Sequence, residues 1–182
     1  MASEPRDVVG LIHTQHTEIA GLLSRVIAET GPERETRFGE LRRLTAVHET
    51  AEQEVVYPVL RSLGGDGRRI ADARAAEEAE GVKVLSRLED LDPNSAEFLD
   101  LFDEFRSAVA RHSHAEEDEV LPLLLSTQDA DRRRQMAEMF ATAEQAAPTH
   151  AHPHAGTSAA AHVITGPALT IIDHVRDALH KT

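Results

Sequence analysis

The sequence predicts an all-α protein, folded as an antiparallel up-down four-helix bundle with a C-terminal helical extension. One observation is composition: the 182 residues are rich in Ala, Leu, Glu and Arg, and only 3% are aromatic, which favours helices. The other is pattern, because four long segments carry apolar residues at helical spacing and are separated by short turns. Four helices of this length with short connections are typical of an up-down bundle.

The first two segments, residues 7–29 and 33–63, are separated by Gly31 and Pro32. Glycine commonly ends a helix and proline commonly opens one, so this pair predicts a sharp reversal. The second segment contains Pro58, which should kink or break it because proline lacks a backbone N–H donor. A glycine-rich stretch, GGDG at 64–67, should close that segment.

The third and fourth segments are residues 68–91 and 96–125, joined by the turn sequence DPNS. The serine of this turn can cap the helix that follows it. Pro122 stands near the end of the fourth segment in the same role as Pro58. We therefore expect the chain to be divided into four parts. These are a bundle at 1–128, an additional helix at 129–147, a linker rich in His, Ala and Pro at 148–165, and a helix at 166–182 that packs on the bundle.

Charge and composition narrow the function. The net charge of −13 argues against nucleic acid and anionic membrane surfaces as partners, because both would repel the protein. The chain has no cysteine, which excludes disulfides, thiolate metal sites and thiol catalysis. No signal peptide and no apolar run of membrane-spanning length is recognisable, so we expect a cytoplasmic protein.

One eleven-residue phrase occurs twice, as HETAEQEVVYP at 48–58 and HSHAEEDEVLP at 112–122. Each copy places a glutamate four residues after a histidine, which puts both side chains on one face of a helix. In both helices this face continues the apolar core stripe. Because an isolated buried charge is costly, ionisable residues on a core stripe must be paired or must coordinate a metal.

The other two helices offer partners for these pairs. His16 lies between Ile12 and Ile19 on the apolar stripe of the first helix, and Glu78 lies four residues before Val82 on the third. Glu77 competes with Glu78 for the inward position. His114, Glu117 and Glu119 are expected to face away from the site. The predicted metal ligands are His16, His48, Glu52, Glu78, His112 and Glu116.

Three histidines and three glutamates converging on one place suit a dinuclear metal site in which carboxylates bridge the ions. Hard oxygen and borderline imidazole ligands favour iron or manganese, with zinc as a substitute. The alternative is structural, because a single His-x-x-x-Glu on a helix is commonly an exposed ion pair. Two such pairs on core stripes, each followed by an acidic stretch and a proline, favour the metal site.

On these motifs the chain resembles the hemerythrin-like family, whose members are also called HHE cation-binding domains. The resemblance covers residues 7–126. It implies a four-helix bundle with a non-heme diiron centre that binds dioxygen, senses oxygen or iron, or handles peroxide and nitric oxide. By this resemblance His16, His48, Glu52, His112 and Glu116 would bind two iron ions per chain. Glu52 and Glu116 would bridge the ions, and an additional oxo bridge would be compatible with this set.

The sequence departs from the family at the third helix, which typically supplies one or two histidines. This chain has no histidine between His48 and His112, and Glu78 stands where that histidine is expected. An anionic ligand stabilises the ferric state, which disfavours simple reversible oxygen carriage and favours redox reaction with dioxygen or peroxide. Sensing of oxygen, iron or nitric oxide without turnover is the alternative, and a purely structural centre is a third reading.

Overall fold

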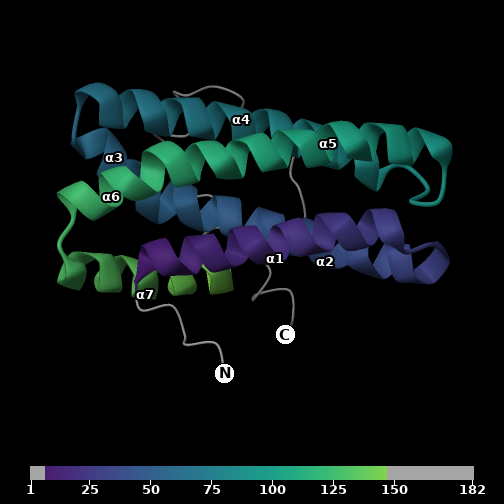
Figure 1. Ribbon diagram of the computed structural model, residues 1–182, viewed down its shortest axis with the longest axis horizontal. Helices are drawn as coiled ribbons and strands as arrows, with labels where there is room; N and C mark the ends of the chain where they lie inside the picture. The colour runs from purple at the N-terminus through teal and green to yellow at the C-terminus, as the bar shows by residue number, and fades with distance from the viewer. Residues whose placement is uncertain (1–6, 147–182) are drawn as a thin grey trace, which may run out of the picture.

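The structure is a computed structural model that describes residues 7–146 (Figure 1). The described residues are all-helical and contain no strand, as the sequence predicts. The predicted linker at 148–165 and the predicted C-terminal helix at 166–182 lie outside the described residues. No helix within 7–146 combines the length and the apolar character needed to cross a membrane.

Helices α1 (Val8–Ala28) and α2 (Gly31–Ala51) form one side-by-side pair (Figure 1). The Asp7 side chain caps α1 by accepting a hydrogen bond from the Gly10 N–H, which satisfies one of the free amides at the helix start. Gly31 opens α2 with a φ of 61°, a left-handed conformation that favours glycine. The Gly-Pro pair therefore produces the reversal that the sequence predicts.

Helices α4 (Gly65–Glu89) and α5 (Ala96–Ala115) form the second pair (Figure 1). The Ser95 hydroxyl caps α5 by accepting from the Phe98 N–H at 3.1 Å. Helix α4 begins three residues earlier than predicted, because Gly64 and Gly65 make the turn, with φ of 70° and 43°. A Cβ at Gly67 would lie 2.4 Å from the Leu60 carbonyl oxygen, so close packing of α4 against the preceding helix requires glycine there.

The two prolines do not break their helices outright. Instead α2 passes through a π-helical turn, η1 (Glu52–Val56), into α3 (Tyr57–Ser62). Likewise α5 passes through η2 (Glu116–Val120) into α6 (Leu121–Thr127). The Tyr57 N–H donates to the Glu52 carbonyl in the wider five-residue pattern, and proline follows in the first turn of the next helix, where its missing N–H is tolerated. Such π-turns are frequent at functional sites.

The core consists of two apolar clusters separated along the helices. Phe38, Phe98 and Phe102 anchor the cluster toward the α4–α5 turn. Tyr57, Leu124 and Phe140 belong to the other cluster, which includes α7 (Ala130–Ala146). Helix α7 packs against α1, α2 and η1 (Figure 1). Between the two clusters, each long helix except α7 has polar residues at its core-facing positions.

Candidate metal centre

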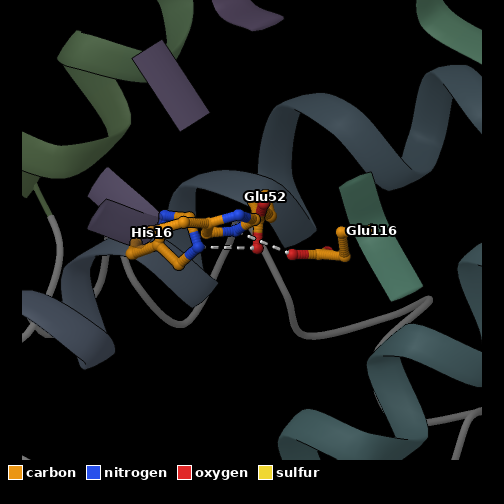
Figure 2. A group of neighbouring side chains, drawn as sticks. His16, Glu52 and Glu116 are labelled. Carbon is orange, nitrogen blue, oxygen red and sulfur yellow. Dashed lines mark hydrogen bonds and ion pairs between the residues drawn. The ribbon is translucent and has the colours of Figure 1, made fainter. Parts of the chain in front are cut away.

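The structure brings all six predicted residues together in this polar layer. They come from successive elements of the chain: His16 from α1, His48 from α2, Glu52 from η1, Glu78 from α4, His112 from α5 and Glu116 from η2. Glu52 and Glu116 are 0% exposed, and Glu78 is 2% exposed. Figure 2 shows His16, Glu52 and Glu116 pointing toward one another. The repeated phrase therefore places its histidine and glutamate inward in both copies.

Two overlapping sets of side chains have the geometry of a metal site. The first His/Glu group is His16, His48, Glu52 and Glu116; the second His/Glu group is Glu52, Glu78, His112 and Glu116. Within each group, one atom from every residue lies within 4.8 Å of the others. Glu52 and Glu116 belong to both groups. A carboxylate has two oxygens, so each of these glutamates can serve both groups at once.

Several buried atoms of these residues lack hydrogen-bond partners among the described residues. They are His48 Nε2, His112 Nε2 and both carboxylate oxygens of Glu52. Their contacts inside the cluster are longer ion-pair contacts of 3.4 Å, from His48 Nε2 to Glu52 Oε2 and from His112 Nε2 to Glu116 Oε2. Buried polar atoms are nearly always satisfied, because leaving one unpaired costs about 1–3 kcal/mol. Nitrogen and oxygen lone pairs directed into one small volume are the donors that iron, manganese and zinc accept. The residues present therefore fit a cation site.

Each histidine is oriented by a partner at its Nδ1 atom. His48 Nδ1 lies 2.7 Å from Gln15 Oε1, His16 Nδ1 lies 3.0 Å from Glu117 Oε1, and His112 Nδ1 lies 3.0 Å from Glu77 Oε2. A proton held on Nδ1 leaves the Nε2 lone pair free to bind a metal. His16 Nε2 lies 3.2 Å from Glu116 Oε2, inside the first His/Glu group.

The expectation that Glu117 faces away from the site is wrong. Its side chain is 33% exposed, yet it reaches back to His16 and also lies 3.4 Å from His13 Nδ1. Glu117 continues the face of α5 that carries Ala110 and Ser113, and this face lies against α1 beside His16. Glu119 ion-pairs with Arg74, outside the cluster of six.

The structure distinguishes Glu78 from Glu77. The Glu78 side chain is fully buried and accepts hydrogen bonds from the Tyr57 hydroxyl and from Gln53 Nε2, the latter at 2.5 Å. The Glu77 side chain is 44% exposed, and it pairs with Arg74 and with His112 Nδ1. The Tyr57 hydroxyl also lies 2.8 Å from Glu116 Oε1. Tyr57, which stands directly before the proline in the first copy of the repeated phrase, thus hydrogen-bonds to two of the predicted ligands.

Burial and mutual repulsion raise the pKa of the carboxyls of Glu52 and Glu78 well above the usual value of 4.5. Glu49, which sequence reasoning did not single out, has its pKa raised to about 8 by burial and by the Glu116 charge. Burial would also raise the pKa of Glu116, but its hydrogen bond to His16 and the nearby imidazoles lower it to about 2. One carboxylate is therefore ionised while its neighbours hold protons that a cation would displace.

The pKa values of two histidines of the centre are also shifted in opposite directions. Burial lowers the pKa of His48 to about 3, so its imidazole is neutral, as metal ligation requires. Burial would lower the pKa of His16 too, but hydrogen bonds and charges from Glu116 and Glu117 outweigh it and raise that pKa. His16 and Glu116 thus share a charged hydrogen bond, and a cation entering the first His/Glu group would replace the proton between them.

A small cavity of about 280 Å³ leads from the surface between α1 and α5 to His16. Ile19, Leu23 and Val109 line it, and Glu117 and His114 lie on its polar side. The volume falls just below the usual range for pockets that hold organic ligands. His16 is the one of the six predicted ligands that lines the cavity, so its size favours a very small reactant approaching that histidine over a larger substrate.

Comparison with known proteins gives two matches. The family described as hemerythrin HHE cation binding domain matches residues 7–124. A DNA nickase from Nostoc sp. is 23% identical over 141 residues, which cover 76% of this chain and 39% of the nickase. The chain thus spans well under two thirds of that relative. No solved structure was found to match the chain significantly.

Proposed function

Because the chain belongs to the hemerythrin HHE cation-binding family, with residues 7–124 matched, we propose that it is a non-heme diiron protein that reacts with dioxygen or peroxide. In this proposal α1, α2 with η1 and α3, α4, and α5 with η2 and α6 form the antiparallel four-helix bundle, and α7 is added to it. Each of the two His/Glu groups would hold one metal ion. Glu52 and Glu116, which belong to both groups, would serve both ions.

The single observation that carries the proposal is the pair of groups sharing Glu52 and Glu116, with their unpaired atoms directed inward. A structural ion-pair cluster would satisfy these atoms with hydrogen bonds. Iron bound here would supply the electrons for reduction of dioxygen or peroxide. Manganese and zinc fit the same donors and would serve as substitutes.

The surrounding residues favour redox reaction with dioxygen or peroxide over reversible binding and transport of dioxygen. With Glu78 in place of an imidazole, three carboxylates and three histidines form the centre, and the added negative charge favours the higher oxidation state. The Tyr57 hydroxyl, between Glu78 and Glu116, can hold a proton beside the reacting volume. The two apolar clusters on either side exclude bulk water, and the cavity at His16 admits a small reactant.

The test uses protein loaded with iron under anaerobic conditions and then exposed to hydrogen peroxide. We expect peroxide consumption over many cycles when excess ascorbate is present as the electron donor that returns the iron to the ferrous state, faster than an equal amount of free iron with the same donor gives. Protein loaded with zinc is the matched control, because it fills the site without redox chemistry. A single spectral change with no further consumption would favour the alternative, a sensing or metal-binding module without turnover. Absence of bound iron would refute the proposal.

The relative's printed name does not suggest a second function for this chain. Nicking requires close approach to DNA, whereas this protein carries a net charge of −13, which opposes binding to phosphate backbones. Only 39% of the nickase aligns with this chain. We therefore propose dioxygen or peroxide as the partner and no nucleic acid.

Glu78 allows a direct test of the carboxylate-for-imidazole exchange. Glu78 belongs to the second His/Glu group only, so Glu78→Ala should weaken the binding of one metal ion more than the binding of the other. Glu78→His should keep both ions, and it should slow the oxidation of the ferrous protein in air because one anionic ligand is lost. Iron stoichiometry and the rate of absorbance change on aeration measure the two effects. Equal weakening of both ions by Glu78→Ala, or unchanged oxidation in Glu78→His, would contradict the assignment.

A further inference from the structure

Helix α7 lies beyond the residues that match the family, 7–124, yet it is linked to the metal centre by two hydrogen bonds in series. Gln15 Nε2 donates to the carboxylate of Glu144 on α7. Gln15 Oε1 in turn lies 2.7 Å from His48 Nδ1. Gln15 is 7% exposed, and its hydrogen bond to His48 is buried, so water has little access to replace it.

The carboxylate of Glu144 determines which atoms donate and which accept in these two hydrogen bonds. An ionised carboxylate only accepts hydrogen bonds, whereas an amide can donate from nitrogen and accept at oxygen. Glu144 therefore fixes the Gln15 amide with its nitrogen outward and its oxygen toward His48. That oxygen requires a proton on His48 Nδ1, and the Nε2 lone pair is left free to face the first His/Glu group.

Packing holds Glu144 in this position. Met136 and Phe140 on α7 are 0% exposed and belong to the same core cluster as Ile12 and Val55. The Phe140 ring centroid lies 6.2 Å from that of His48. The helix is thus fixed against the imidazole that Glu144 influences through Gln15.

We propose that α7 is an added control element of the metal centre, in which Glu144 is a positioning residue that sets the donor state of His48 through Gln15. The inference rests on the proposed two-metal function. Because His48 belongs to the first His/Glu group only, Glu144 acts on one metal ion and not on the other. A helix that merely covers the core would leave the position of the proton on His48 unchanged.

The test is anaerobic titration of the metal-free full chain with Fe(II) against a chromophoric chelator, which yields two affinities. Glu144→Leu removes the acceptor and should weaken one affinity about tenfold, at the lower end of what losing an outer hydrogen-bond partner of a ligand costs. Glu144→Gln keeps the size of the side chain, but its amide can donate as well as accept and so no longer fixes the orientation of Gln15; it should weaken the same affinity by less than Glu144→Leu does. Glu138→Leu, at an exposed position of the same helix, is the matched control and should change neither affinity.

A second measurement does not depend on metal. Nitrogen NMR of the metal-free protein should show His48 protonated at Nδ1 in the parent and as a mixture of tautomers in Glu144→Leu. Two unchanged affinities in Glu144→Leu, or equal weakening of both, would overturn the inference, as would an unchanged His48 tautomer. If the parent binds no Fe(II), the proposed function fails instead, and the NMR result alone decides whether Glu144 orients His48.

Discussion

Replacing Glu52 with glutamine is expected to abolish binding of both metal ions while the metal-free protein stays folded. Glu52 is shared by the two His/Glu groups, so its loss removes a ligand from each. The carboxylate is fully buried and neither oxygen makes a hydrogen bond among the described residues. Loss of a direct ligand should exceed the roughly 10- to 100-fold that outer hydrogen-bond partners cost in metal affinity.

Glutamine is the informative substitution because burial and nearby charges raise the pKa of Glu52 well above 4.5. This shift favours the protonated carboxyl in the metal-free protein, and a neutral amide of the same shape imitates that form. The melting temperature of metal-free Glu52→Gln should therefore equal or exceed that of the metal-free parent. A ligand role and a structural role are thereby separated in one variant.

Two further variants should lose only one of the two metal ions and can be compared with Glu52→Gln. His48→Ala removes a nitrogen from the first His/Glu group only, and His112→Ala from the second only. Each should reduce metal content toward one ion per chain, whereas Glu52→Gln should reduce it toward none. Glu80→Gln, with a side chain that is 72% exposed, is the matched control and should bind both ions. Full metal content in Glu52→Gln, measured by elemental analysis of protein from iron-replete cells, would contradict the two-metal site.

The residues of the centre could be predicted because they obey the helical period. His16, His48, Glu52 and Glu116 each continue an apolar stripe, and a polar residue on such a stripe has to be buried with partners. The all-helical fold followed from the same periodicity. The family match confirms the resemblance read from the two copies of the repeated phrase.

What the sequence could not show are contacts that depend on tertiary packing or on a departure from ideal helix geometry. The contact of Glu117 with His16 depends on how α5 and η2 pack beside α1, which helical spacing within one segment does not reveal. Gln15 and Glu144 are separated by more than a hundred residues, and neither is part of a motif. Proline at 58 and 122 was the available signal for the π-turns, because a missing N–H requires the preceding turn to change its hydrogen bonding.

Removal of metal is expected to lower the melting temperature strongly, and by a larger amount at pH 8 than at pH 6.5. A ligand present at a thousand times its dissociation constant stabilises the native state by about 4 kcal/mol per site. At about 2–4 °C per kcal/mol for a chain of this size, two sites correspond to a difference of roughly 15 °C or more. Thermal melts of the iron-loaded, zinc-loaded and chelator-stripped protein would measure it.

The pH dependence follows from the shifted pKa values of the metal-free protein. Glu52, Glu78 and Glu49 hold protons in the folded state above 4.5, the usual value at which the unfolded state releases them. Their contribution to stability is therefore lost as pH rises toward the folded pKa, which for Glu49 is about 8. His48 acts oppositely, because its pKa of about 3 costs stability only as pH falls below 6.5. Above pH 6.5 the stability of the metal-free protein should consequently fall.

Bound metal removes this loss, since the ligating carboxylates are already deprotonated and proton release favours metal binding at higher pH. The difference in melting temperature between metal-loaded and metal-free protein should thus increase steadily from pH 6.5 to pH 8. Magnesium at the same concentration is a suitable control ion, because it prefers an octahedral set of oxygens over imidazole. In Glu52→Gln, added iron should raise the melting temperature little at either pH. A gap that is absent, or that narrows as pH rises, would show that the six residues form a structural hydrogen-bonded cluster.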